Sequence, residues 1–387
     1  VKGEAVKALE NLRSGLRDWF GKIQNFAVDA ETGEEYGWKD VLTFEEGIDA
    51  EDRQRIKNAI VKTPVLREAL FLFSNGISLR LDNILPGGVW ISVLVVRNDK
   101  SIYRISVQTR FQGSFDITLH LNKNLPPAKV GEELKWLILA ETNMKDERLL
   151  PKYGGYWEEY DIWTEAFVPR DSVARFLQRE LLRKSENYEP RLQVLWTFFV
   201  WNAAKAYFNF WQLTNREIEL ANPLPDNITI PSHDYHRGTL LYSVSQRKKS
   251  SSIISYFINF YNLFVKKTFE EFPVLKNDSI WNYIFSGVIE ADGEVGGLKI
   301  LKEFKNELRE QNDIEEKEFL LKKIDSFISS VESDGYIPKA LFFAIKRFHR
   351  WLKLNEEASL SAQAEMLYDL YETYELFDLE EKYPAVR

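Results

Sequence analysis

The sequence contains no cysteine, which excludes disulfide bonds, thiolate metal sites and cysteine nucleophiles. It also lacks a glycine-rich phosphate loop, a dinucleotide-binding fingerprint, a Gly-x-Ser-x-Gly elbow and a His-Glu-x-x-His helix. Nucleotide-driven motors, Rossmann oxidoreductases and α/β-hydrolases are therefore not expected. With these signatures missing, whether the protein is an enzyme stays open at this point.

Long apolar runs are also missing. The most apolar stretch, residues 192–213, carries Lys205 near its middle, and a membrane-spanning helix would have to bury that charge in lipid. We therefore expect a buried core helix there and no membrane partner. No signal peptide is visible, so a cytoplasmic location is expected, although the first residue is valine and the natural N-terminus is not identified.

What the sequence does have is many aromatic residues. Phe, Trp and Tyr make up 14% of its 387 residues. Each ring buries roughly 150–250 Å², so most of these side chains must lie in a core or at an interface.

The net charge of −8 repels nucleic acid unless a local basic surface overrides it. Basic residues do gather at 247–249 and at 346–353, but nucleic acid is not favoured as a partner.

The fold class predicted from the periodicity is α+β. Apolar residues recur at helical spacing near the N-terminus, and Asp49 is expected to cap a helix that ends near Lys62. Between residues 77 and 121, apolar and polar residues alternate in runs separated by short turns, which predicts a small antiparallel β-meander. One expected strand covers residues 77–82. We expect an α+β domain over residues 1–165.

The remainder, residues 166–387, is predicted to be a mainly α-helical domain. Helical spacing of apolar residues recurs from residue 173 to the C-terminus, interrupted by a proline-containing loop at 222–238. The last helix is expected over 361–379, with Leu367 and Leu370 facing inward. No internal repeat is visible, and the domain boundary is expected between residues 145 and 171.

The leading functional hypothesis concerns the polar face of the meander. Alternation places hydrogen-bonding side chains on one side of neighbouring strands. Such a surface suits an anionic or polyhydroxylated ligand, or a partner protein, and it predicts a non-catalytic binding or assembly component. The alternative interpretation is an ordinary solvent-facing surface of an antiparallel sheet. The candidate ligand-binding residues are Arg104, Gln108, Arg110, Thr118 and His120.

A second candidate surface is the aromatic segment 153–163, which we expect to be a loop because it contains Gly154-Gly155. Amphipathic rings in a loop can stack on sugars, bases or a partner protein. The interleaved acidic residues disfavour a phosphate backbone and tolerate a glycan. The segment therefore predicts a carbohydrate-active or carbohydrate-binding protein that uses Tyr156, Trp157 and Trp163, unless these rings simply cover the sheet.

The alternative enzymatic hypothesis rests on the loop His233-Asp234-Tyr235-His236-Arg237. Two of the four histidines of the chain lie here three residues apart. They can hold a divalent metal together with Asp234, or act as acid and base beside an anion-binding Arg237. This arrangement indicates a metal- or His-dependent hydrolase, for example a nuclease. The structural alternative is a loop held by hydrogen-bonding side chains.

The residues Phe285 to Gly293, FSGVIEADG, resemble the signature helix of LAGLIDADG homing endonucleases. The resemblance covers nine residues. It implies that Asp292 holds a divalent metal and that the small residues let two helices pack closely, as in a homodimer. Such a motif is followed by a DNA-reading antiparallel sheet, whereas residues 298–310 here predict a charged helix. The structural alternative is a buried helix end stopped by glycines.

Overall fold

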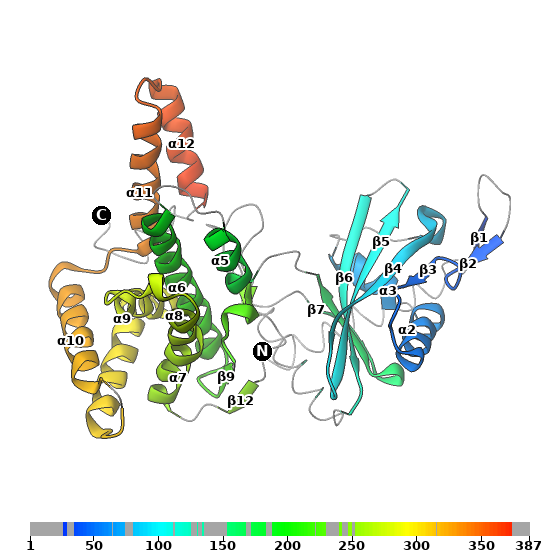
Figure 1. The fold of residues 1–387 in the computed structure, drawn as a ribbon, viewed down its shortest axis with the longest axis horizontal. Coiled ribbons are helices and arrows are strands. Elements are labelled where there is room, and N and C mark those ends of the chain that lie inside the picture. The colour runs from blue at the N-terminus through cyan, green and yellow to red at the C-terminus, as the bar shows by residue number, and fades with distance from the viewer. Residues whose placement is uncertain are drawn as a thin grey trace. The chain divides into compact units, whose positions relative to one another are not determined.

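The computed structural model confirms the α+β class and divides the chain into two compact units (Figure 1). One unit comprises Val1–Lys145 with Pro151–Val168, and the other comprises Asp146–Leu150 with Pro169–Arg387. We call them the sheet unit and the helical unit. The structure describes residues 26–28, 35–63, 65–73, 80–110, 113–124, 130, 134, 153–167, 172–182, 188–220, 222–229, 240–241, 247–249, 252–314 and 316–373.

A six-stranded mixed sheet forms the centre of the sheet unit, in the order β3-β4-β5-β6-β8-β7. Its strands are β3 (Leu42–Phe44), β4 (Ile84–Val96), β5 (Lys100–Thr109), β6 (Gly113–Asn122), β7 (Tyr153–Trp157) and β8 (Ile162–Ala166). The short strand β3 pairs in parallel with β4, and all other neighbours are antiparallel. A separate hairpin consists of β1 (Phe26–Val28) and β2 (Glu35–Gly37).

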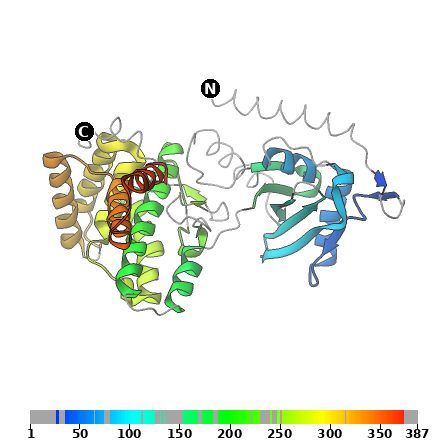
Figure 2. The ribbon, with the colours of Figure 1, turned by 90° about the horizontal axis from the view of Figure 1, so that it is seen from above.

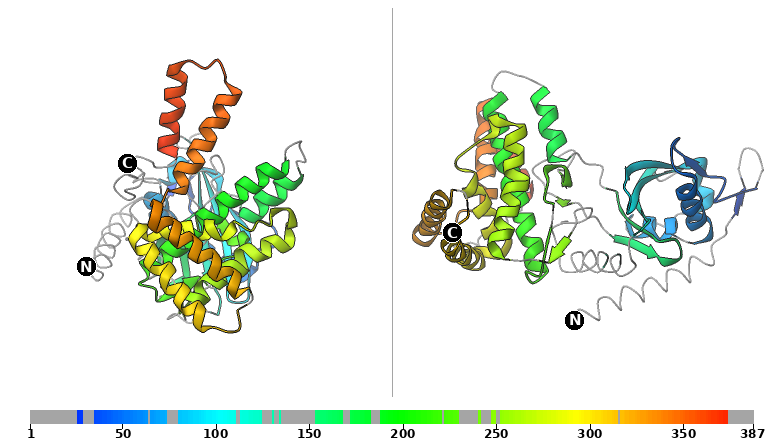
Figure 3. Two further views of the ribbon diagram at one scale, coloured as in Figure 1. Left: turned by 90° about the vertical axis from the view of Figure 1, so that its left-hand side faces the viewer. Right: turned by 60° about the horizontal axis from the view of Figure 1, so that its bottom comes forward.

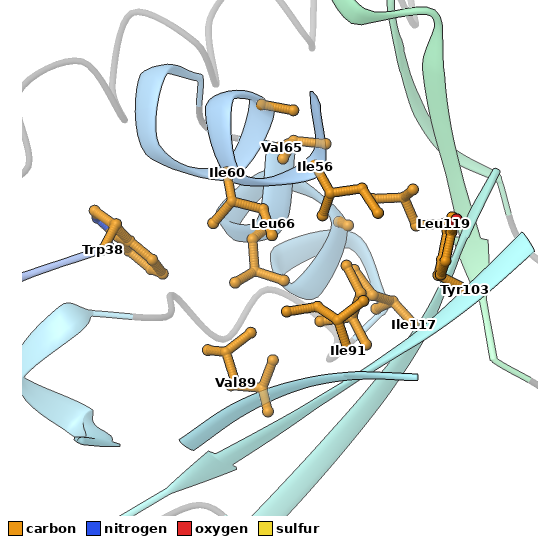
Figure 4. Close-up of a cluster of buried hydrophobic side chains, with 14 of the residues drawn as sticks. Trp38, Ile56, Ile60, Val65, Leu66, Val89, Ile91, Tyr103, Ile117 and Leu119 are labelled. Carbon is orange, nitrogen blue, oxygen red and sulfur yellow. The ribbon is translucent and has the colours of Figure 1, made fainter. Parts of the chain in front are cut away.

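Two helices, α2 (Ala50–Lys62) and α3 (Val65–Phe73), cover one face of this sheet. The Asp49 side chain accepts the backbone N–H of Glu51 at 2.8 Å, so the predicted N-cap of α2 is confirmed. Because side chains alternate along a strand, Val89 and Ile91 of β4 point toward the helices while Trp90 points away. The inward residues form one hydrophobic core (Figure 4).

Two local predictions in the sheet unit are wrong. Residues 81–83 form a 3-10 turn rather than the end of a strand, and residues 77–79 lie outside the described part. The segment 153–163 is a hairpin of β7 and β8, not a loop, and its turn is the 3-10 segment Glu158–Tyr160. Asp161 closes that turn with a φ of 51°, a left-handed conformation that Asp tolerates better than most residues.

The helical unit is built around α6 (Tyr188–Leu213) and α9 (Ile280–Glu310), which pack against each other. Gly287 lies where the two backbones approach closely, because a Cβ added there would come within 2.7 Å of Lys205 N. Gly293, with a φ of 74°, kinks α9. The stretch 192–213, predicted to be a core helix, is therefore confirmed, and no helix in the described ranges is long and apolar enough to cross a membrane.

The remaining helices pack around this pair (Figure 2). They are α5 (Val173–Leu182), α7 (Ile253–Phe260), α8 (Lys267–Glu271) and α10 (Lys317–Asp334), with the π-helical segment Tyr261–Lys266 between α7 and α8. The 3-10 segments are Pro225–Asn227 and Pro273–Leu275, and the short strands are β9 (Ile218–Leu220), β10 (Ile228–Thr229), β11 (Leu240–Leu241) and β12 (Arg247–Lys249). Phe257 stacks on Phe304 at 4.0 Å between ring centroids, which shows where part of the aromatic excess is buried.

The last two helices, α11 (Lys339–Leu354) and α12 (Leu360–Thr373), form a hairpin that projects from the other helices of this unit (Figures 1 and 3). Phe343 anchors the base of α11 against Phe198 of α6, with ring centroids 5.2 Å apart. Leu370 is buried as predicted, but the inward position predicted for Leu367 is wrong, because its side chain is 40% exposed.

Candidate functional site

The face of the sheet that points away from α2 and α3 carries the predicted polar residues. Its cross-strand pairs follow from the register: Ser92 lies opposite Arg104, which lies opposite Thr118 on β6. The neighbouring row continues from Trp90 through Ser106 to Asp116. Neighbouring pairs of this kind lie about 5 Å apart, so these side chains form one continuous surface.

One half of this face is open to solvent, and we call it the open patch; it consists of Trp90, Ser92, Arg104, Ser106, Gln108 and Asp116. Trp90 is 45% exposed, an unusual position for the largest side chain on a strand. Gln108 is also exposed, and the other four residues are half-buried. The open patch therefore presents an aromatic ring beside donors and acceptors of hydrogen bonds.

A hydrogen-bonded network holds the polar part of the open patch. Arg104 donates through Nε and Nη2 to the two carboxylate oxygens of Asp116, at 3.1 and 2.8 Å. Ser106 donates its hydroxyl to the same carboxylate. The guanidinium also lies over the Phe167 ring, 4.6 Å from its centroid. Such a bidentate, stacked arrangement fixes the orientation of the Arg104 side chain.

The other half of the face is buried and forms what we call the buried cluster: Thr118, His120, Trp163 and Glu165. His120 Nε2 lies 2.9 Å from Glu165 Oε1, and the imidazole stacks on the Trp163 ring at 3.6 Å. Only 1% of Trp163 is exposed. The structure thus places Thr118, His120 and Trp163, three predicted ligand-binding residues, where no ligand can reach them without rearrangement.

The other residues of the aromatic segment are held inside the hairpin. Trp157 belongs to the hydrophobic core beneath the helices and is 5% exposed. Tyr156 is half-buried and donates its hydroxyl to Asp161 at 3.2 Å. Burial and the Asp161 carboxylate raise the pKa of Tyr156 to about 12. Of the three aromatic candidates, only Tyr156 keeps partial exposure.

Arg110 lies outside the strand alternation, in the turn that follows β5, where its backbone N–H donates to Asn83 O at 2.7 Å. The side chain is half-buried. Strict alternation predicts that Arg110 lies on the same face as Arg104 and Gln108. It does not continue that row, because β5 ends at Thr109.

The predicted catalytic and metal-binding loop, His233, Asp234, His236 and Arg237, lies outside the described residues. Asp292 is described: it is exposed on α9 and accepts a hydrogen bond from Gln212 Nε2 at 3.3 Å. Burial raises its pKa despite the opposing effect of Arg216 and Lys299. Within the described ranges, no three His, Asp or Glu side chains converge as metal ligands.

Within the segment that resembles the homing-endonuclease helix, the small residue Gly287 packs against another helix of the same chain. Gly287 packs on Ala204 of α6, and α9 continues as a helix to Glu310 where that family has a sheet. Its neighbour Glu290 accepts hydrogen bonds from Tyr336 OH at 2.6 Å and Lys339 N at 2.7 Å. Burial raises the pKa of Glu290 and lowers that of Lys339.

Sequence reasoning missed Trp90, the most exposed aromatic ring of the open patch. The run Val89 to Val96 reads as a near-continuous apolar strand, so no residue in it stood out. A signal for it was available: Trp90 lies on the same side of the strand as Ser92, whereas Val89 and Ile91 lie on the inward side.

Comparison with known proteins gives no further indication of function, because no protein-family model and no curated protein matches this chain.

Proposed function

We propose that this protein is a non-catalytic binding component whose sheet unit recognises a polyhydroxylated ligand, such as an oligosaccharide, through the open patch. The observation that carries this proposal is the exposed Trp90 ring beside the oriented Arg104–Asp116–Ser106 network. An indole stacks on the apolar C–H face of a sugar ring, while fixed polar groups bind its hydroxyls.

The charges of the open patch favour hydroxyl groups over anions. Arg104 and Asp116 neutralise each other at 2.8 Å, so an anion that approaches the guanidinium also meets a carboxylate. Only two of the five N–H donors of Arg104 are used by Asp116, and a carboxylate has about four acceptor positions. Hydroxyl groups both donate and accept, so they match this mixed set better than a phosphate or carboxylate does.

The fixed orientation of Arg104 in the patch also supports binding. The residues of the patch stand on paired strands, and Arg104 is fixed by both Asp116 and the Phe167 ring. A ligand therefore does not need to order the Arg104 side chain, which lowers the entropic cost of association. Rigid strands position a binding site more accurately than loops do.

We predict that Trp90→Ala weakens oligosaccharide binding about 10-fold or more, because the stacking platform is lost. The full chain is first tested on an array of neutral and acidic oligosaccharides, and the strongest hit is then titrated by calorimetry. Arg104→Ala is expected to act in the same direction. Both variants should keep a melting temperature close to that of the parent, since neither residue belongs to the core.

Val96→Ala is the matched control for this experiment. Val96 lies on the same strand and is 63% exposed, but it is roughly 20 Å along β4 from Trp90. Its substitution should leave affinity unchanged. Absence of binding to every oligosaccharide, or equal losses for Trp90→Ala and Val96→Ala, would reject the proposed function.

A further inference from the structure

The helical unit contains a cavity of about 980 Å³. Its lining comes mainly from α7, the π-helical segment, α8, the first turn of α9 and the segment 313–320 at the start of α10. This volume lies near the upper end of the range of about 300–1,000 Å³ that is typical of sites for small molecules. The cavity is therefore large enough for a ligand of several linked rings.

Aromatic side chains form much of the apolar lining. Tyr261 of the π-helical segment stacks on Trp281 of α9, with 4.5 Å between the ring centroids. Phe269 of α8 is half-buried, and Phe319 of α10 is 39% exposed. All four residues line the one cavity. Because the face of an aromatic ring carries partial negative charge, such a lining attracts flat rings and cations.

The backbone of one wall departs from ordinary helix geometry. In the segment Tyr261–Lys266 the helix widens, and the N–H of Lys267 donates to Asn262 O, five residues earlier. Turns of this π-helical kind are rare and occur frequently at functional sites. The segment contributes Tyr261, Asn262 and Lys266 to the lining. Its position in the wall of the cavity therefore supports a binding role, independently of the aromatic rings.

The charged residues of the lining carry an excess of negative charge. Four carboxylates and two ammonium groups line the cavity, and all six side chains are exposed: Glu270, Asp278, Asp313, Glu316, Lys266 and Lys276. The N-termini of α9 and α10 also reach the cavity, but each adds only about half a positive charge. The excess of carboxylates is not reversed. These charges and the rings line the same cavity, so both act on one ligand.

We propose that this cavity binds an organic cation with a planar aromatic body. The aromatic body packs against Tyr261, Phe269 and Phe319, and the positive charge is attracted both by the rings and by carboxylates such as Asp313 and Glu316. The site lies wholly within the helical unit. It does not depend on the open patch of the sheet unit, and either proposal can fail without the other.

Thioflavin T, a planar aromatic cation whose fluorescence rises when it is held rigidly, is the probe for this site. The full chain is expected to bind it with a dissociation constant of about 100 μM or lower. The uncharged analogue that lacks the methyl group on the ring nitrogen should bind at least about 10-fold more weakly, because it loses the attraction of the rings and carboxylates. Equal affinity for the two dyes, or no binding of thioflavin T, would overturn the proposal.

Substitutions in the lining locate the bound dye. Phe319→Ala should weaken thioflavin T binding about 10-fold, and so should the double variant Asp313→Asn with Glu316→Gln. Melting temperatures should stay close to that of the parent, because all three side chains are exposed.

The matched controls lie outside the cavity in the same unit. Leu354→Ala removes an apolar side chain that is 76% exposed, and Glu356→Gln with Glu357→Gln removes two exposed carboxylates. Both controls should bind thioflavin T like the parent. Losses in the controls as large as those in the lining variants, or unchanged affinity in both lining variants, would show that the dye does not occupy this cavity and would refute the proposed site.

Discussion

Replacing Gly287 with alanine is expected to destabilise the helical unit, although the same change inside an ordinary helix stabilises it by about 1 kcal/mol. An added Cβ would lie 2.7 Å from both Ala204 Cβ and Lys205 N, and 2.8 Å from Trp201 O. Two of these three atoms belong to the backbone of α6, so the helices themselves must separate. We expect a loss of about 1–3 kcal/mol for alanine and a larger loss for valine, in the manner of an overpacked core.

Urea unfolding followed by circular dichroism at 222 nm measures this effect. Ala291→Gly is the control, because it introduces the opposite change one turn further along the same helix, where the residue is half-buried. Its cost should not exceed the helix propensity difference of about 1 kcal/mol. A stability gain in Gly287→Ala would show that α6 and α9 are not in close contact at this position.

Replacing Asp52 with alanine is expected to cost the sheet unit about 2–4 kcal/mol, because it leaves the buried Tyr103 hydroxyl and the half-buried Lys123 ammonium without their shared carboxylate. Asp52 is 3% exposed and accepts a hydrogen bond from the Tyr103 hydroxyl, while Lys123 Nζ lies 2.8 Å from its Oδ2. Three segments that are distant in sequence thus meet at Asp52: α2, β5 and the end of β6. Tyr103→Phe removes only one of these contacts and should cost less.

The same carboxylate gives the stability of the sheet unit a defined pH dependence. Burial acts to raise the pKa of Asp52, but hydrogen bonds from Lys123 and Tyr103 outweigh it and lower the pKa below its usual value. A carboxylate with a lowered folded pKa stabilises the fold above the unfolded pKa, and that contribution is lost as the pH falls through the folded value.

Urea unfolding of the parent and of Asp52→Asn at pH 7 and pH 3 separates the contribution of Asp52 to stability from the contributions of the other carboxylates. The parent should lose more stability between these pH values than Asp52→Asn, which carries no charge at this position. An identical loss in both proteins would show that Asp52 is not the titrating group.

Much of this fold follows from local patterns. Alternation over residues 89–121 correctly indicates strands whose apolar residues face one core, and Asp49 correctly marks the start of α2. The hairpin 153–166 was not recognised because Gly154 and Gly155 interrupt its alternation and the turn residues resemble an aromatic loop. Strand pairing between distant segments supplies stability that local propensity does not record.

The candidate site was predictable only in part. Alternation assigns Arg104, Thr118 and His120 to the same face, and the register confirms that placement. Alternation does not tell which part of a face is covered, and for this reason His120 and Trp163 were expected to be accessible although they are buried. The same limit explains Leu367: helical spacing identifies an apolar stripe but does not reveal whether the chain itself provides the surface that covers it.

Hydroxyl-radical footprinting with mass spectrometry tests the accessibility and use of the open patch most directly. In the free protein, Trp90 should be oxidised readily while Trp157 and Trp163 remain protected, in line with their exposed fractions of 45%, 5% and 1%. Addition of the oligosaccharide with the strongest array signal should protect Trp90 and leave Val96 reactive. Ready oxidation of Trp163 in the free protein, or unchanged oxidation of Trp90 when the oligosaccharide is bound, would contradict the account.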